Sequence, residues 1–363
     1  MIGQHKSTLN TPCLVIDKDK LLQNINDMQA FALKYHKSVR PHAKTHKCTE
    51  IAKLQKQQGA IGICATKVSE ALVLAEHGIT GILITSPVVT ENKLNMLSKV
   101  YQLAPDTMVV CDSFANAEEL NQFALNHLKQ SMDVIVDIDA GIGRTGVSFE
   151  HAIALARHIN ELSHLNLKGI QCYAGHFQHI SGYNKRQEAS SLLLKKAGEI
   201  KAQIEAQTGL KNLIQTGSGT GTYAIDCNVQ SVTEIQPGSY TVMDKEYFDI
   251  ESINSFLPAM TLLSTVISAN HETHVTVDAG LKALYKDPTK PQIISHDDLY
   301  YDWDYFGDEH GKVTGNPLPK LGDIIEMVVP HCDPTINLFD QFYITENDIV
   351  TDVWPINLRG KSQ

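Results

Sequence analysis

Between residue 20 and about residue 250, short apolar runs alternate with stretches of helical periodicity, and no other feature constrains the fold as strongly. The runs are continuously apolar, which is typical of parallel strands buried on both faces. They lie at residues 60–65, 81–85, 107–111, 133–139, 167–173 and 212–217. With residues 39–44 as the first strand and a run near 233–243 as the last, eight strand–helix units predict a (β/α)8 barrel. A doubly wound open sheet is the competing architecture. We rank it second because no unit carries the GxGxxG pattern.

The expected helices occupy the stretches between these runs. In the first of them, apolar residues such as Leu21, Ile25 and Met28 repeat with the period of a helix. The predicted helices lie at 20–35, 48–58, 67–77, 91–103, 116–129, 150–163 and 185–207.

After about residue 252 the long helical periods disappear. Segments such as TLLSTVISA, HVTVDAG and DIIEMVVPH are rich in β-branched residues, with Gly and Pro between them. This residue pattern predicts a smaller β-rich domain. The stretch 7–17, STLNTPCLVID, is also strand-like and precedes the first barrel unit. We therefore expect a barrel domain at 20–252 and a β-rich domain formed by 1–19 plus 253–363.

Composition narrows the classes of partner and compartment. The net charge of −10 argues against a nucleic-acid partner, because phosphate binding requires a basic face. No apolar run reaches the roughly 18 residues that span a bilayer, so no membrane segment is expected. The first residues lack the apolar core of a signal peptide. The seven scattered cysteines, with no CxxC spacing, suit free thiols in a reducing cytoplasm.

The stretch VRPHAKTHK (39–47) gathers cations within an acidic protein. If it is the first barrel strand, Arg40, His42, Lys44 and His46 point the same way, toward the active-site mouth at the carboxyl ends of the strands. A lysine crowded by cations and partly desolvated has a lowered pKa, which makes its amine a nucleophile toward carbonyl groups. A solvated basic loop is the alternative.

A glycine-rich stretch, TGSGTGTY (216–223), follows the seventh expected strand. Its glycines free backbone N–H groups to face an anion, and its hydroxyl groups are further donors. Barrels often bind phosphate in the loops after strands 7 and 8, so this loop is a candidate phosphate site. A flexible polar turn is the alternative. It is not a Walker loop, because the GK[ST] ending is missing.

Three further segments carry candidate functional groups. The turn DAGIGRTGV (139–147) holds Arg144 at a strand end, and CYAGHFQHI (172–180) offers Tyr173, His176, Gln178 and His179 at another. In VVPHCDPTINLFD (328–340), His331 and Asp333 would fall on one face of an extended strand. One imidazole and one carboxylate, completed by water, suit Mn²⁺, Mg²⁺ or Zn²⁺. A salt-bridged arginine, structural histidines and a chance H-x-D pair are the respective alternatives.

Taken together, these segments resemble the D-threonine aldolase/D-serine dehydratase family, whose members bind pyridoxal phosphate (PLP) on an alanine-racemase-like barrel. The likeness covers nearly the whole chain and keeps its order. The matching stretches are TPCLVID, RPHAKTHK, DIDAGIGRTGV, YAGHFQH, GSGTGTY, QPGSYTVMD, VDAGLKAL, GDEHG and PHCDPTINL.

The resemblance implies roles for individual residues. Lys44, rather than Lys47, matches the lysine that holds PLP as a Schiff base. The loop residues match the phosphate cradle, Arg144 matches an arginine near the PLP phenolic oxygen, and His179 matches a histidine that takes part in acid–base work. The implied cofactor contacts are Lys44, Thr66, Arg144, Tyr173, Thr216, Ser218, Gly219, Thr220 and Gly221. Thr66 matches least well, because some relatives carry glutamine there. His331 and Asp333 match the metal ligands.

The resemblance also separates related activities. In this family, members that resemble dehydratases carry H-x-C at the metal, and members that resemble aldolases carry H-x-D. The resemblance of His331-x-Asp333 therefore favours an aldolase, which would cleave a β-hydroxy-D-amino acid to glycine and an aldehyde. A D-serine dehydratase, an amino-acid racemase and a non-catalytic PLP carrier are the alternatives. Relatives of this fold resemble head-to-tail dimers, so we expect a homodimer.

Overall fold

The computed structural model describes residues 1–251 and 255–363, which form two compact units. The barrel unit comprises Met28–Lys44, Ile51–Gly238 and Lys361–Gln363, and the β-rich unit comprises Met1–Asp27, Thr45–Glu50 and Ser239–Gly360. The predicted domain boundary between residues 252 and 253 lies outside the described residues. The division into 20–252 and the remainder stays a prediction.

Eight parallel strands form the sheet of the barrel unit. They are β2 (Ser38–Val39), β3 (Ile63–Ala65), β4 (Ile82–Ile84), β5 (Met108–Cys111), β6 (Met132–Asp137), β7 (Leu165–Cys172), β8 (Ile214–Gly217) and β9 (Glu234–Ile235). Their order is β2-β9-β8-β7-β6-β5-β4-β3. The N–H groups of Ile61 and Cys64 donate to the carbonyls of Val39 and Pro41, which joins the two ends of this order. The predicted barrel is therefore confirmed, and the open doubly wound alternative is wrong.

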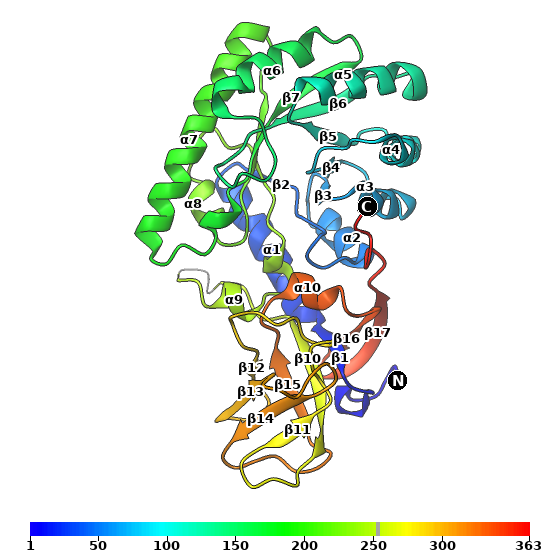
Figure 1. Cartoon of the computed structure of the whole chain (residues 1–363), viewed down its shortest axis with the longest axis vertical. Helices are drawn as coiled ribbons and strands as arrows, with labels where there is room; N and C mark the ends of the chain where they lie inside the picture. The colour runs from blue at the N-terminus through cyan, green and yellow to red at the C-terminus, as the bar shows by residue number, and fades with distance from the viewer. Residues whose placement is uncertain (252–254) are drawn as a thin grey trace. The chain divides into compact units, whose positions relative to one another are not determined.

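Helices follow the strands, as the alternation of the sequence predicts. They are α1 (Lys18–Lys34), α2 (Thr49–Gln57), α3 (Val68–Glu76), α4 (Glu91–Leu103), α5 (Phe114–Phe123), α6 (Phe149–Glu161), α7 (Tyr183–Thr208) and α8 (Tyr223–Asp226). Figure 1 shows α4 to α7 on the outside of the neighbouring barrel strands. The strands stay continuously apolar because they are covered on both faces. One buried cluster joins four successive strands through Cys64, Leu83, Met108, Val110 and Ile135.

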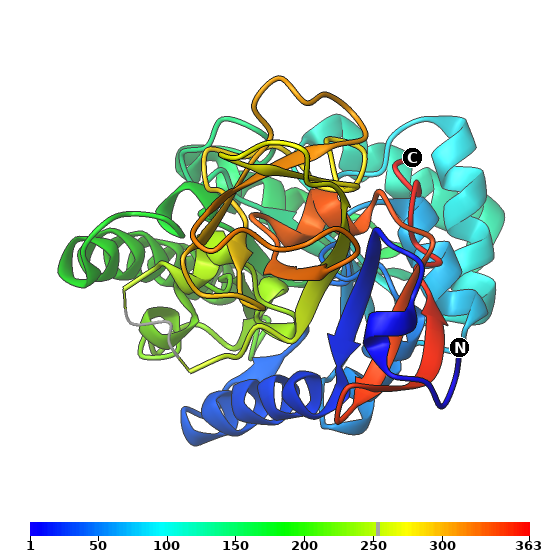
Figure 2. The same cartoon turned by 90° about the horizontal axis from the view of Figure 1, so that it is seen from below.

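The β-rich unit contains a nine-stranded sheet that includes the N-terminal strand. Its strands are β1 (Cys13–Asp17), β10 (Met260–Ser268), β11 (Val275–Val277), β12 (Gln292–Ile293), β13 (Leu299–Asp302), β14 (Gly311–Gly315), β15 (Ile324–Val328), β16 (Gln341–Glu346) and β17 (Ile349–Pro355). β1 pairs antiparallel with β10 and parallel with β16. Figure 2 shows this dark-blue strand among segments from late in the chain. Two short helices, α9 (Lys245–Phe248) and α10 (Cys332–Ile336), belong to the same unit.

The structure shows the state of the cysteines and the character of the helices. All seven cysteines are buried, and none forms a disulfide within the described residues. Across 1–251 and 255–363, no helix has the length and apolarity that crossing a bilayer requires.

Candidate functional site

The segment 39–47 departs from the expected strand. β2 ends at Val39, His42 makes an isolated parallel bridge to Cys64, and residues 43–46 form a turn. Backbone hydrogen bonds to the neighbouring strands continue past Pro41, from the His42 N–H to the Pro237 carbonyl and from the Ala43 N–H to the Cys64 carbonyl, before the chain turns. The side-chain alternation of a strand therefore does not extend to Lys44, and this part of the sequence reasoning is wrong. The choice of Lys44 over Lys47 rests on the family resemblance.

Arg40 does not join a cationic cluster around Lys44. Its guanidinium is buried and forms a two-pronged ion pair with Glu234, with Nε–Oε1 and Nη2–Oε2 distances of 3.1 and 3.2 Å. A third donor binds the carbonyl of Gly81. Gly81 precedes β4 and Glu234 begins β9, so the side chain lies at the amino ends of the strands. The expectation for Arg40 is wrong, because a buried guanidinium needs a carboxylate partner and Glu234 supplies it at that end.

His42 is held in one tautomer next to Lys44. The Lys44 N–H lies 3.4 Å from His42 Nδ1, which makes Nδ1 an acceptor. His42 Nε2 then carries the hydrogen and donates to Thr85 Oγ1 at 3.1 Å, while that hydroxyl donates to the carbonyl of Ala65. Thr66 Oγ1 lies 3.5 Å from the same Nε2. His42, Thr66 and Thr85 thus form one polar group where β2, β3 and β4 end.

A chain of buried polar side chains links the later strands. Gln171 Nε2 donates to Asp137 Oδ1 at 2.9 Å, and Gln236 Nε2 donates to both Gln171 Oε1 at 3.2 Å and Thr216 Oγ1 at 2.9 Å. Asp137 also accepts a hydrogen bond from Thr145, which ties the Arg144 turn to the end of β6. These mutual bonds satisfy polar groups that would otherwise be costly to bury.

Asp137 makes the stability of the barrel pH-dependent. Burial raises its pKa to about 6, although the hydrogen bonds from Gln171 and Thr145 oppose the shift. The native state then binds more protons than the unfolded state between about pH 4 and pH 6. Deprotonation of Asp137 therefore lowers the free energy of unfolding of the protein as the pH rises through that window. In Asp137→Asn this loss is absent. The free energy of unfolding of the variant minus that of the wild type should rise by about 2–3 kcal/mol between pH 4 and pH 7.

Denaturant unfolding across this pH range measures the difference. Asp133→Asn, on the same strand and beside Lys168, controls for the loss of a carboxylate. A difference between Asp137→Asn and the wild type that stays constant with pH would contradict the assignment.

The glycine-rich loop after β8 is fixed by Gln178. The Gln178 amide accepts the Gly221 N–H at 2.7 Å and donates to Thr222 Oγ1 at 2.9 Å. A Cβ at Gly219 would lie 2.6 Å from Gln178 Oε1, and one at Gly221 would lie 2.4 Å from the Gln178 carbonyl oxygen. Glycine is therefore required at position 221, where a Cβ would meet backbone, and at position 219 it allows the close approach of the Gln178 amide. The Gly221 N–H is already engaged with Gln178, so it is not a donor for a bound anion in this conformation.

Ser218 is the loop residue best suited to an additional ligand. It has a left-handed φ of 70° and is 4% exposed. Its hydroxyl lies near Asp226 but has no well-directed hydrogen-bond partner among the described residues. Asp226 is itself occupied by the hydroxyls of Ser190 and Thr222. Buried hydroxyl and amide donors in a glycine-rich loop fit the phosphate of a cofactor.

The Arg144 turn and the segment after β7 come together. The Arg144 guanidinium carbon lies 5.8 Å from the centre of the Tyr173 ring, which is a cation–π distance. The turn is shaped by Asp139, whose carboxylate accepts the N–H groups of Gly141 and Gly143. His179 is exposed, so its side chain is accessible to a substrate; its catalytic role stays a prediction.

His331 and Asp333 are brought together by a helix start, not by a strand. His331 is the N-cap of α10 and Asp333 lies in its first turn. The expected extended conformation is wrong, since Pro334 fits the first turn of a helix. The two side chains nevertheless approach, with 4.0 Å between His331 Nε2 and Asp333 Oδ2. Cys332 is fully buried, and burial, followed by nearby Asp244, raises its thiol pKa well above the ordinary value.

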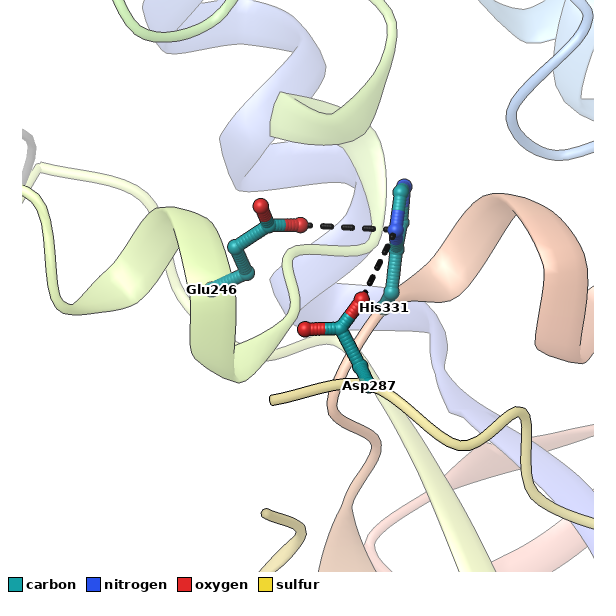
Figure 3. Close-up of side chains that lie close together, drawn as sticks. All are labelled: Glu246, Asp287 and His331. Carbon is teal, nitrogen blue, oxygen red and sulfur yellow. Dashed lines mark ion pairs between the residues drawn. The ribbon is translucent and has the colours of Figure 1, made fainter. Parts of the chain in front are cut away.

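Two carboxylates that sequence reasoning missed also meet His331. Glu246 Oε2 and Asp287 Oδ2 lie 3.4 and 3.8 Å from His331 Nδ1 (Figure 3). Burial raises the pKa of Glu246, and Asp287 and Asp333 act in the same direction while His331 opposes them. Ligand atoms of Glu246, Asp287 and His331 lie within 4.8 Å of one another. Oxygen and imidazole donors of this kind suit Mg²⁺, Mn²⁺ or Zn²⁺.

Comparison with known families matches both parts of the chain. Residues 16–246 match "Alanine racemase, N-terminal domain", and residues 259–345 match "Putative serine dehydratase domain". The first match alone covers more than half of the chain.

Individual relatives extend this likeness over the full length. A D-threonine aldolase from Arthrobacter sp. is 36% identical over 367 residues, covering 99% of this chain and 96% of the relative. A 3-hydroxy-D-aspartate aldolase from Paracoccus denitrificans is 33% identical, covering 99% and 94%. The crystal structure of D-threonine aldolase from Filomicrobium marinum superimposes with a TM-score of 0.92 at 32% identity, covering 100% and 99%. The chain therefore belongs to the D-threonine aldolase/D-serine dehydratase-like family, which carries an alanine-racemase-type barrel.

Proposed function

We propose that this protein is a PLP- and metal-dependent lyase that cleaves a β-hydroxy-D-amino acid to glycine and an aldehyde. The observation that carries the proposal is the identity of 33–36% with two aldolases over 99% of the chain. D-threonine and 3-hydroxy-D-aspartate are the substrate types that the names of these relatives suggest.

The barrel unit supplies the residues that would hold PLP. Lys44 would bind it covalently, and Ser218, Gly219 and Thr220 would receive its phosphate beside Thr216. The Gly221 N–H is engaged by Gln178, so Gly221 would serve the phosphate loop through its lack of a side chain. Thr66, Tyr173 and Arg144 would border the cofactor. The buried Ser218 hydroxyl and the glycines packed on Gln178 fit this role. When bound, PLP supplies an electron sink for the electrons left at Cα. Arg144 then contributes a fixed positive charge beside the cofactor.

The β-rich unit supplies the residues that would hold the metal. His331 and Asp333 are the proposed ligands, and their nitrogen and oxygen donors suit Mn²⁺, Mg²⁺ or Zn²⁺. Such an ion, when bound, supplies Lewis acidity that lowers the pKa of a substrate hydroxyl. His179, the histidine that the resemblance connects with acid–base work, would accept the proton of the β-hydroxyl.

The alternatives predict different products or none. A D-serine dehydratase releases pyruvate and ammonia, and the family resemblance connects that activity with cysteine at the position of Asp333. A PLP carrier gives no turnover and leaves the β-rich unit without a role. A homodimer and a cytoplasmic location stay predictions from the sequence.

A product assay separates these functions. The purified protein, loaded with PLP and Mn²⁺, is given D-threonine, D-allo-threonine, D-phenylserine and 3-hydroxy-D-aspartate, with L-threonine as the control. We expect glycine and the matching aldehyde from at least one D-substrate, and loss of turnover when EDTA is added. Keto acid and ammonia without glycine would support a dehydratase, and no product from any D-substrate would support a carrier.

A further inference from the structure

The His331 imidazole has carboxylates near both of its ring nitrogens. Nδ1 lies 3.4 Å from Glu246 and 3.8 Å from Asp287, whereas Nε2 lies 4.0 Å from Asp333. Figure 3 shows Glu246 and Asp287 directed at the same nitrogen. A histidine that binds a metal through one nitrogen generally donates the N–H of the other to a carboxylate or carbonyl oxygen. One nitrogen of this ring is therefore suited to donate its N–H to a carboxylate, and the other is suited to bind a metal.

We propose that the Glu246 carboxylate, with Asp287 beside it, holds the hydrogen of His331 on Nδ1 and so presents its Nε2 to a divalent cation beside Asp333. This inference rests on the metal site of the proposed function and adds two positioning residues to it. A neutral imidazole has one N–H, so a hydrogen held on Nδ1 leaves the lone pair of Nε2 as the ligand. The two carboxylates also place negative charge near the cation, which favours its binding.

Asp244 fixes the backbone on both sides of this contact. It is fully buried, and its two carboxylate oxygens accept the N–H groups of Tyr247, at 2.9 Å, and Cys332, at 2.8 Å. One side chain thus ties α9, which carries Glu246, to the start of α10, which follows His331. Two more bonds join the same segments, from the N–H groups of Lys245 and Glu246 to the carbonyls of Val329 and Pro330. These hydrogen bonds therefore hold the two segments that carry Glu246 and His331 next to each other.

The loop after β11 orients the second carboxylate. Asp287 Oδ1 accepts the N–H of Thr289 at 3.1 Å, which leaves Oδ2 directed at His331. The ring of Tyr285 stands edge-on to the imidazole, with 6.4 Å between the ring centres and an angle of 89°. The imidazole is thus bounded by groups from three segments that are distant in the sequence.

Calorimetric titration of the PLP-loaded protein with Mn²⁺ tests the proposal. Glu246→Leu and Asp287→Leu should each weaken Mn²⁺ binding by about 10- to 100-fold. Glu246→Gln should weaken it less, because its amide oxygen still accepts the Nδ1–H. Asp333→Asn should weaken it more than any of these. Glu346→Gln, a Glu→Gln change at an ion pair with Lys18 in the same unit, should leave the affinity unchanged.

Each result decides between distinct alternatives. Unchanged affinity in both leucine variants would overturn the positioning role and leave the metal site standing. Loss of binding in Glu246→Gln as complete as in Asp333→Asn would show that Glu246 is a direct ligand, which also overturns it. If the wild type binds no Mn²⁺, the metal site of the proposed function fails together with this inference. Thermal unfolding and the PLP absorbance of each variant establish that it is folded.

Discussion

Lys44→Ala is expected to abolish both the visible absorbance of protein-bound PLP and the cleavage of D-amino acids. The primary amine at this position is the proposed attachment point of the cofactor, and no other group in the polar set around His42 can form that bond. We expect turnover to fall on the order of 1,000-fold or more. The absorbance spectrum after removal of free PLP and the release of glycine measure the two effects.

Two controls make the Lys44 prediction specific. Lys44→Arg keeps the positive charge but removes the primary amine, so it should lose the absorbance as Lys44→Ala does. Lys47→Asn removes the neighbouring amine at a residue with a left-handed φ of 49°, which asparagine tolerates. That variant should keep PLP. Retention of the absorbance in Lys44→Ala, with its loss in Lys47→Asn, would show that the wrong lysine was chosen.

The barrel could be predicted from the sequence because strands that are buried on both faces consist of continuous apolar residues. Strands such as β5 and β6 read as unbroken apolar runs, and the helices between them keep their period. Prediction failed where the chain leaves regular structure. Residues 43–46 form a turn, so strand alternation does not reach Lys44. Alternation also grouped Arg40 with His42, although Arg40 pairs with Glu234 at the amino end of β9, because side-chain parity does not say at which end of a strand a residue lies.

The candidate site also contains residues that the sequence could predict and residues that it could not. Thr66, Tyr173 and Ser218 directly follow strands, and the carboxyl ends of parallel strands meet at one edge, so their gathering could be expected from the topology. Glu246 and Asp287 carry no such signal. They come from a four-residue helix and an irregular loop, each more than 40 residues from the next member of the cluster, so no periodicity connects them with His331.

Asp333→Ala is expected to keep the absorbance of bound PLP and lose most of the turnover. Asp333 is not among the residues that the family resemblance assigns to the cofactor, so we expect its loss to leave PLP bound. Removing a direct metal ligand should lower turnover by more than the roughly 10- to 100-fold typical of residues that only support a ligand. Asp333 lies in the first turn of α10, where loss of a negative charge costs only about 0.3–1 kcal/mol of stability, so the variant should fold.

Metal dependence distinguishes this loss from a general defect. Turnover of the wild type should fall with EDTA and return with excess Mn²⁺, whereas Asp333→Ala should recover little at the same Mn²⁺ concentration because one of the two proposed ligands is missing. Asp340→Ala provides a matched control, since that carboxylate is exposed and pairs with Arg359 at the surface. It should behave as the wild type does. Full activity of Asp333→Ala in the presence of EDTA would mean that the reaction needs neither this carboxylate nor a metal, and the β-rich unit would then require another role.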